Sequence, residues 1–304
     1  MININTRFIT LIGTPLSQSF AARMQNAAYD AADINMRYFY TETDSEHLGE
    51  IINGIRYMPS FAGAAVTKPN KVKVLQYLDE LDPLCEKMGA CNTIMKLPDG
   101  KLRGYNTDGI GFYTSITTEA GIDVKGETFF CIGAGGAGRA ICSVLAYYGA
   151  KKIYITSLYD EETEETVEKI NRNFGRRSKP GADANDTISP AQAVNHGDYS
   201  CLKDCDMIIN ASGVGMGKSA GTSPVPKEHL VPGKFYFDAC YNPEKTQFLM
   251  DAESIGGKIM NGLSMSLYQG VTQIRLWSGK EAPVEVMRQE LKNILEEKNR
   301  GGER

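Results

Sequence analysis

The fold of this 304-residue chain is decided by one stretch, Thr128-Phe-Phe-Cys-Ile-Gly133-Ala-Gly135-Gly136-Ala-Gly138-Arg139-Ala140. Its apolar first half predicts a buried strand, and the glycines that follow predict a turn into a helix from about Gly136 to Tyr148. Gly133, Gly135 and Gly138 have the spacing of a dinucleotide-binding turn. There the first glycine allows the turn, the second admits a pyrophosphate, and the third lets the helix pack on the strand. The amides at the helix N-terminus would then face the phosphates.

The residues after this turn decide between a cofactor site and an ordinary strand–helix turn, in which glycine serves only packing. A second apolar segment, Lys152 to Thr156, predicts the next strand, and Asp160 lies just beyond it. An acidic side chain about 20 residues after the turn can accept hydrogen bonds from the hydroxyls of a ribose. The sequence therefore predicts a dinucleotide site.

Composition restricts the class of protein. A hydrophobic content of 42% and a charged content of 23% are typical of a soluble globular chain, and the length suggests about two domains. The net charge of −4 gives no reason to expect nucleic acid or an anionic membrane as a partner. No apolar run reaches the roughly 18 residues that a membrane-spanning helix needs.

The cysteines and histidines exclude two kinds of site. Seven scattered cysteines, an odd number, predict a reduced, cytoplasmic protein. Cys201 and Cys205 lack a second ligand pair, so no metal site is expected. The three histidines, His47, His196 and His229, lie in polar segments, which disfavours a histidine-based dehydrogenase mechanism.

Strands and helices alternate along most of the chain. In the first half, residues 7–13, 36–41 and 61–66 predict strands, and residues 92–97 and 102–105 predict a hairpin. Helices are expected over 21–32, 45–57, from Pro69 to Leu78, and from Gly109 to Ala120. This alternation predicts an α/β fold whose first half contains a mostly parallel sheet. Further strands over 207–210 and 235–239 and helices over 264–278 and 283–299 continue the pattern, and residues 176–190 predict an exposed loop.

Polar side chains gather where the strands of the first half end. Each has an ordinary structural explanation of its own, as a helix cap, a turn residue or a solvated side chain. The carboxyl ends of parallel strands meet at one edge of a sheet, however, so these side chains together favour a small, polyhydroxylated, anionic ligand. They are Ser19, Thr67, Lys71, Asn92, Asn106 and Asp108.

At these residues the chain resembles the shikimate dehydrogenase family, including its quinate/shikimate branch, over nearly its whole length. The matching segments are Gly13-x-Pro15-x-x-x-Ser19, Val66-Thr67-x-Pro69-x-Lys71, Gly89-Ala90-x-Asn92-Thr93, Gly104-x-Asn106-Thr107-Asp108-Gly109-x-Gly111, Gly133 to Ala140, Asn210-Ala211-Ser212, Asp238-x-x-Tyr241-x-Pro243, Gly262-Leu263-x-Met265-x-x-x-Gln269-Gly270 and Trp277-x-Gly279.

The resemblance implies a two-domain oxidoreductase with its active site in the cleft between the domains. Residues 1–110, completed by the C-terminal helices over 263–304, would form the substrate-binding domain. Residues 111–262 would form a Rossmann-type, doubly wound dinucleotide-binding domain. A hydride would pass between a nicotinamide cofactor and the ring hydroxyl of shikimate, quinate or a closely related cyclic hydroxy acid. A homodimer is compatible with this arrangement.

The resemblance also assigns residues. The catalytic pair falls on Lys71 and Asp108. The substrate contacts fall on Ser19, Tyr38, Thr67, Asn92, Tyr241 and Gln269. The cofactor contacts fall on Gly133, Ala134, Gly135, Gly136, Ala137, Gly138, Ser212 and Gly262, and the residues after the second strand of this domain add Ser157 and Asp160.

The expected pair suits the chemistry. Oxidation of an alcohol requires removal of its proton as the hydride leaves. A lysine accepts that proton only when it is neutral, a state that burial favours and a neighbouring carboxylate opposes. The base is therefore assigned to Lys71 and Asp108 as a coupled unit and not to one of them.

Two departures from the family pattern concern the substrate. The family loop reads Ser-x-Ser-Pro, whereas this chain has Ser19-Phe-Ala21-Ala22, and one lost hydrogen bond to a charged group is worth about 1.5–3 kcal/mol. Lys68 stands where the family mostly has an apolar residue, so it either replaces the lost carboxylate contact or is simply solvated. A family member with a shifted substrate, and a non-catalytic ligand-sensing protein, are therefore alternatives, the second disfavoured by retention of Lys71 and Asp108.

A third departure concerns the cofactor. NADP-dependent relatives carry Asn-Arg-Thr or Asn-Arg-Ser after the second strand, where the arginine binds the 2′-phosphate. This chain has Ser157-Leu-Tyr159 followed by Asp160, which can bind ribose hydroxyls and repel a phosphate. The sequence therefore predicts NAD in preference to NADP by at least about tenfold, or 1.4 kcal/mol, unless Arg139 or the pair Lys151 and Lys152 rescues NADP binding.

Overall fold

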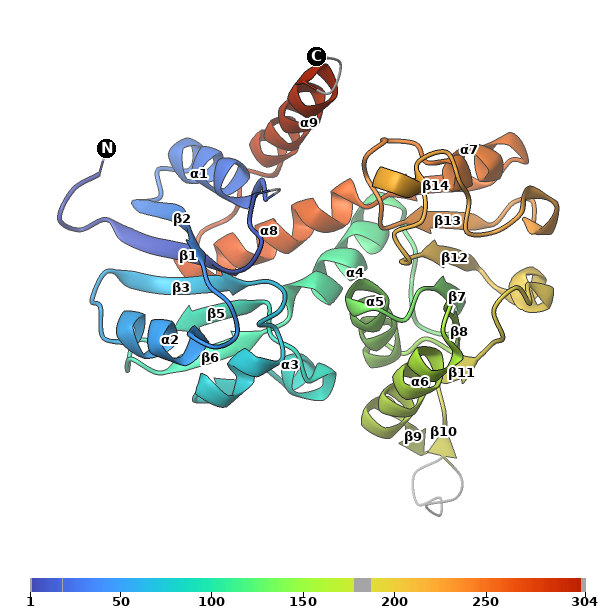
Figure 1. Ribbon diagram of the computed structural model, residues 1–304, viewed down its shortest axis with the longest axis horizontal. Helices are drawn as coiled ribbons and strands as arrows, with labels where there is room; N and C mark the ends of the chain where they lie inside the picture. The colour runs from blue at the N-terminus through green and yellow to red at the C-terminus, as the bar shows by residue number, and fades with distance from the viewer. Residues whose placement is uncertain (1, 18, 178–186, 302–304) are drawn as a thin grey trace. The chain divides into compact units, whose positions relative to one another are not determined.

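The computed structural model describes residues 2–17, 19–177 and 187–301, and the chain divides into two compact units (Figure 1). The first unit comprises Met1–Gly111 and Leu267–Arg304, and the second comprises Phe112–Ser266. Each unit is built on a six-stranded sheet. The α/β fold predicted from the alternation of strands and helices is confirmed.

The sheet of the first unit is mixed, with the strand order β2-β1-β3-β5-β6-β4. Strands β1, β2 and β3 run parallel, with β2 at the edge. Strands β5 and β6 form an antiparallel hairpin beside β3, and β4 pairs parallel with β6 at the other edge. All six residues of β3 are buried, as expected for a central strand covered on both faces. The strands are β1 (Arg7–Gly13), β2 (Met36–Glu42), β3 (Phe61–Val66), β4 (Glu80–Leu81), β5 (Thr93–Lys96) and β6 (Leu102–Tyr105).

The helices of this unit come from both ends of the chain, and α9 packs on α1. They are α1 (Ala21–Ala31), α2 (Leu48–Arg56), the 3-10 helix η1 (Lys73–Tyr77), α3 (Pro83–Met88), the start of α4 (Thr107–Glu119), most of α8 (Leu263–Ser278), and α9 (Val284–Gly301). Trp277 of α8 donates a hydrogen bond to the Ile94 carbonyl of β5 at 2.9 Å. A Cβ on Gly63 would lie 2.5 Å from that indole nitrogen, so glycine lets the helix approach β3 closely.

The second unit has a fully parallel sheet in the order β11-β8-β7-β12-β13-β14. The chain proceeds outward from β7 through β8 to β11 and then returns to β12, so the strand order reverses beside β7. In doubly wound sheets, ligands bind outside the carboxyl ends of the strands at such a reversal. The strands are β7 (Thr128–Ile132), β8 (Lys152–Thr156), β11 (Ala191–Ala193), β12 (Met207–Asn210), β13 (Phe235–Asp238) and β14 (Lys258–Asn261).

The remaining elements of the second unit connect these strands. A small antiparallel pair, β9 (Arg176–Arg177) and β10 (Thr187–Ile188), forms a separate sheet, and residues 178–186 of the predicted loop lie outside the described residues. Among the described helices, none is long and apolar enough to cross a bilayer. The helices are α5 (Gly136–Tyr147), α6 (Asp160–Phe174), α7 (Gln247–Ser254) and the 3-10 helices η2 (Ser200–Asp204), η3 (Gly217–Ser219) and η4 (Lys227–His229).

Several elements differ from the local predictions: strands β4, β9, β10, β11 and β14 and helices α6 and α7 were not predicted, and two further differences are informative. The helix expected from Pro69 to Leu78 is only the short 3-10 helix η1, in a segment where branched Val72 and Val74 disfavour an α-helix. Helix α3 was not predicted, although its signals are present in the sequence. The Asp82 side chain accepts a hydrogen bond from the Leu84 amide at 3.0 Å, a proline follows Asp82, and Gly89 ends the helix at φ 65°.

Candidate active site

A lysine, a carboxylate and an amide from three segments of the first unit meet in direct contact. The Lys71 ammonium donates to Asp108 Oδ2 at 2.6 Å, and Asn92 Nδ2 donates to Asp108 Oδ1 at 2.7 Å. Each carboxylate oxygen therefore has its own donor. Three of the residues predicted from strand ends are thus brought together.

The neighbouring hydrogen bonds fix which way the Asn92 amide points. Its Oδ1 accepts from the Thr107 backbone N–H at 2.7 Å and lies 3.1 Å from the Thr107 hydroxyl and 3.0 Å from the Thr93 hydroxyl. A backbone N–H can only donate, so the amide oxygen must face it. The amide nitrogen must then face Asp108.

Backbone contacts set the positions of the other two groups. Lys71 follows β3, and its carbonyl accepts from the Cys91 N–H at 2.8 Å, which ties it to the segment that carries Asn92. Asp108 lies in the first turn of α4, where the helix dipole favours a negative charge. Asn106, just before α4, donates to the Ala90 carbonyl at 3.0 Å and joins the same segment to the helix.

The other predicted substrate contacts are dispersed. Ser19 lies in the loop before α1, half-buried Thr67 follows β3, and half-buried Gln269 lies on α8, all in the first unit. Tyr241 belongs to the second unit, and burial raises its pKa. The substrate role of each of these four residues stays a prediction.

Tyr38 occupies an unusual environment for a substrate contact. Only 2% of the residue is exposed, and its ring lies 6.0 Å from that of Trp277. Within the described part of the chain its hydroxyl has no hydrogen-bond partner, and burial raises its pKa well above the ordinary value. The contact expected for Tyr38 also stays a prediction.

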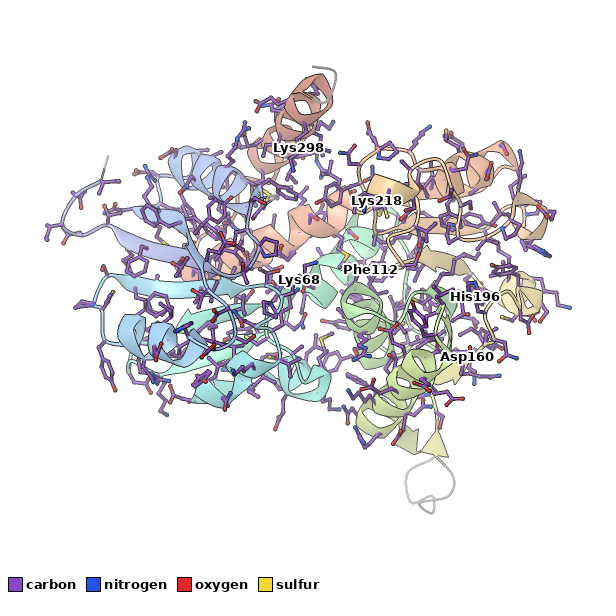
Figure 2. The ribbon with its side chains drawn as sticks, in the orientation of Figure 1. Lys68, Phe112, Asp160, His196, Lys218 and Lys298 are labelled. Carbon is purple, nitrogen blue, oxygen red and sulfur yellow. The ribbon has the colours of Figure 1, made fainter. Side chains whose placement is uncertain are left out.

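The loop that lacks the family's second serine and proline is held by a tyrosine. The Tyr40 hydroxyl donates to the Ser19 carbonyl at 3.0 Å and accepts from the Ala22 N–H at 3.2 Å. Because its proton is used on the loop, Tyr40 does not replace the missing serine as a donor to a substrate. Lys68, labelled in Figure 2, is exposed at the end of β3.

The glycine turn of the second unit has the shape that a pyrophosphate requires. Gly133 has φ 107°, and a Cβ there would lie 2.7 Å from the Ala211 carbonyl. A Cβ on Gly138 would lie 1.9 Å from the Gly133 oxygen, whereas one on Gly135 or Gly136 would meet no atom within 4 Å. The first and third glycines are therefore fixed by packing, and the space beside Gly135 and Gly136 is open for a ligand.

The other predicted cofactor residues take part in local structure. Ser157 is buried and donates to the Tyr159 carbonyl at 2.8 Å, and Ser212 Oγ donates to Asn210 Oδ1 at 2.6 Å. A Cβ on Gly262 would lie 2.0 Å from the Ala239 carbonyl. Asp160 is exposed at the first position of α6 (Figure 2). The cofactor contacts of these residues stay predictions.

A buried carboxylate in the second unit was not assigned a role from the sequence. Asp238, at the end of β13, accepts from Thr246 at 2.6 Å, Asn210 at 3.0 Å and the Cys240 N–H at 2.9 Å. Burial raises its pKa in spite of these donors. The signal was present, because Asn210 and Asp238 end neighbouring parallel strands at the same register. This network orders the loops that follow β12 and β13.

Similar proteins were found both by sequence and by structure. A shikimate dehydrogenase (NADP(+)) of Desulforamulus reducens is 38% identical over 291 residues, which cover 94% of this chain and 95% of the relative. A shikimate 5-dehydrogenase of Listeria monocytogenes, solved with shikimate and NAD, is 34% identical with a TM-score of 0.86, covering 95% of this chain and 98% of that one. A 5-ketofructose reductase of Gluconobacter sp. is 29% identical with a TM-score of 0.83, covering 96% and 100%.

The expected preference for NAD is wrong. The relatives from Desulforamulus reducens, Moorella thermoacetica and Methanocaldococcus jannaschii are named as NADP(+) enzymes. A solved shikimate dehydrogenase, 33% identical with a TM-score of 0.84 over 97% of this chain and 98% of that one, holds NADP+. The prediction gave too much weight to Asp160, an exposed carboxylate whose repulsion of another charge 4 Å away is only about 1 kcal/mol in water.

Family models match both ends of the chain. The shikimate dehydrogenase substrate binding domain matches residues 11–94, and the shikimate 5'-dehydrogenase C-terminal domain matches residues 262–292. These matches agree with the near full-length identity to the curated relatives. The chain therefore belongs to the shikimate dehydrogenase family.

Proposed function

We propose that this protein interconverts shikimate and its ring ketone by hydride transfer with a nicotinamide cofactor, NADP(H) in the first instance. The observation that carries the proposal is the contact of Lys71 with Asp108 at 2.6 Å, with Asn92 on the other carboxylate oxygen. The proposal further assigns substrate binding to the first unit and cofactor binding to the second. The shikimate dehydrogenase relatives of similar length support it.

The residues of the first unit account for the proton. In the oxidation of shikimate, the hydroxyl proton passes to the coupled pair of Lys71 and Asp108 as the carbon loses its hydride. In the reverse direction, the Lys71 ammonium donates a proton to the ketone oxygen. Asp108 keeps the ammonium in place during both steps, and a positioned acid or base of this kind typically contributes about 10²–10⁴ in rate.

The residues of the second unit suit a dinucleotide. The open space beside Gly135 and the uncapped start of α5 at Gly136 fit a pyrophosphate bound to backbone amides. When bound, the nicotinamide supplies the hydride acceptor or donor. Gly133 and Gly138 hold the turn in the required shape.

Steady-state kinetics of the purified protein test the proposal. We expect turnover of shikimate with NADP+, and a loss of about 10²–10⁴ in kcat on substitution of Lys71 by methionine, which keeps the length of the side chain. Quinate, and NAD+ with each acid, complete the comparison. A folded protein that turns over neither acid with either cofactor would refute the proposal.

A second candidate is reduction of an uncharged polyhydroxylated ketone. Ala21 removes one hydroxyl from the loop expected to bind the substrate carboxylate, and the 5-ketofructose reductase similar to this chain is named for a neutral sugar. If this candidate is right, 5-ketofructose is turned over faster than the ketone of shikimate. Ala21→Ser would then not improve shikimate kinetics. In a shikimate enzyme the same change should lower KM for shikimate by about tenfold or more, since one hydrogen bond to a charge is worth about 1.5 kcal/mol or more.

A further inference from the structure

A continuous chain of buried hydrogen bonds connects α1 and α8 to the Asp108 carboxylate. Gln25 Nε2 donates to Gln273 Oε1 at 3.1 Å, and Gln273 Nε2 donates to Thr93 Oγ1 at 2.9 Å. The Thr93 hydroxyl lies 3.0 Å from Asn92 Oδ1, and Asn92 Nδ2 reaches Asp108. The four residues before Asp108 are each at most 3% exposed, and all five belong to the first unit.

Backbone groups at both ends fix the direction of this chain. The Gly270 carbonyl, which can only accept, lies 3.3 Å from the side-chain nitrogen of Gln25 and so identifies that atom as the donor. Gln273 must then present its oxygen to Gln25 and its nitrogen to Thr93. At the other end the Thr107 N–H fixes the oxygen of Asn92 at 2.7 Å.

The Thr93 hydroxyl joins the two fixed ends. Its oxygen accepts a hydrogen bond from Gln273 Nε2, so its own O–H can donate to Asn92 Oδ1 or to the Thr107 hydroxyl at 2.9 Å. In either arrangement a hydroxyl donates to Asn92 Oδ1: Thr93 directly, or Thr107, whose hydroxyl lies 3.1 Å from that oxygen. Every donor in the chain therefore points toward the carboxylate, and hydrogen bonds aligned in this way strengthen one another.

We propose that Thr93 and Gln273 are positioning residues for proton transfer, which keep the Asn92 amide directed at Asp108 and thereby keep Asp108 aligned with Lys71. The expected loss of kcat rests on the proposed function, whereas the alignment of Asp108 with Lys71 does not depend on it. Misplacement of a catalytic group by about 1 Å can cost on the order of 10²-fold in rate. Neither residue needs to touch the substrate for this effect.

The kinetic test compares isosteric variants. Thr93→Val and Gln273→Leu should lower kcat by about tenfold or more while KM changes less than about threefold, since the reacting groups and not the binding contacts are disturbed. Thr93→Ser restores the hydroxyl and should restore most of the lost kcat. Thr10→Val is the matched control, because Thr10 is equally buried in the same sheet and its hydroxyl bonds only to that of Thr41, at 2.7 Å, among the described hydrogen bonds.

A second readout does not depend on turnover. The folded protein is treated with an amine-acylating reagent and then digested, and mass spectrometry follows the labelling of Lys71. The labelling rate reports how firmly Asp108 holds the ammonium. Thr93→Val should label several-fold faster than wild type, and Thr10→Val at the wild-type rate. Unchanged labelling of Lys71 in Thr93→Val, or an equal loss of kcat in Thr10→Val, would overturn the inference. A wild-type protein inactive on shikimate would refute the proposed function while leaving the labelling result to decide this one.

Discussion

Replacing Asp108 by asparagine tests the catalytic geometry most directly. The two carboxylate oxygens accept from the Lys71 ammonium at 2.6 Å and from Asn92 Nδ2 at 2.7 Å. An amide in the same place must turn its NH₂ toward one of these two donors. Asn92 cannot rotate to relieve the conflict, because the Thr107 N–H holds its oxygen at 2.7 Å. The variant therefore loses both the charge and one of the two hydrogen bonds.

The expected effects on rate and on stability differ in size. The side chains of Lys71 and Asp108 are 35% and 23% exposed, so water screens the pair, and its loss should cost about 1 kcal/mol of unfolding free energy or less. Loss of a positioned acid–base pair should lower kcat by about 10²–10⁴, which is roughly 2.7–5.5 kcal/mol in the activation barrier. The ratio of the two effects distinguishes a catalytic role from a structural one.

Steady-state kinetics and chemical denaturation of the same preparations provide the measurement. Asp79→Asn is the matched control, because Asp79 pairs with Arg56 at 2.5 Å in the same unit at side-chain exposures of 33% and 19%. It should lose stability without a comparable loss of kcat. A folded Asp108→Asn protein that keeps more than about a tenth of wild-type kcat would contradict the assignment, since acid–base catalysis contributes about 10²-fold at the least.

Three further outcomes follow from the structure. Gly135→Ala should leave the unfolding free energy within about 1 kcal/mol of wild type but raise KM for the cofactor. Gly138→Ala, whose Cβ would lie 1.9 Å from the Gly133 oxygen, should in addition lower the melting temperature. Equal melting temperatures of the two variants would contradict this expectation. Gln269→Ala should raise KM for the acid substrate more than it lowers kcat, and an unchanged KM would remove Gln269 from the site. Burial raises the pKa of Asp238, so its contribution to stability is complete below about pH 3.9 and is lost as the pH rises through the folded pKa. Asp238→Asn should therefore reduce the dependence of the unfolding free energy on pH, measured by denaturation at a series of pH values. An unchanged dependence on pH would contradict this role of Asp238.

Local rules predicted the parts of the structure that depend on neighbouring residues. The alternation of apolar segments located β3 and β8 at their observed bounds, and the carboxyl-end rule for parallel strands correctly grouped Lys71 and Asp108. The strand predictions succeeded because periodicity is a local property of the chain, and Asn92 joins the group only because β5 runs antiparallel to β3 and so begins at the same edge of the sheet.

Contacts between segments far apart in the sequence could not be predicted from local patterns. Gln273 reaches Thr93 across 180 positions, and no pattern in either segment marks the other as its partner. The cofactor preference failed for a related reason. It was inferred from the charge of one side chain, Asp160, whereas phosphate binding depends on the sum of solvent screening, the helix dipole and all the basic groups nearby.

The division of the first unit between the two ends of the chain has a consequence for biosynthesis. The second unit is contiguous, so its translation is complete before most of α8 and all of α9 are made. The sheet of the first unit is translated earlier but lacks Gln273 and Trp277, whose hydrogen bonds to Thr93 and Ile94 complete β5, until the last segment is released. The order in which the two units are completed during translation is thus the reverse of the order in which they begin, and a chain that ends after Ser266 would contain the whole second unit but only part of the first.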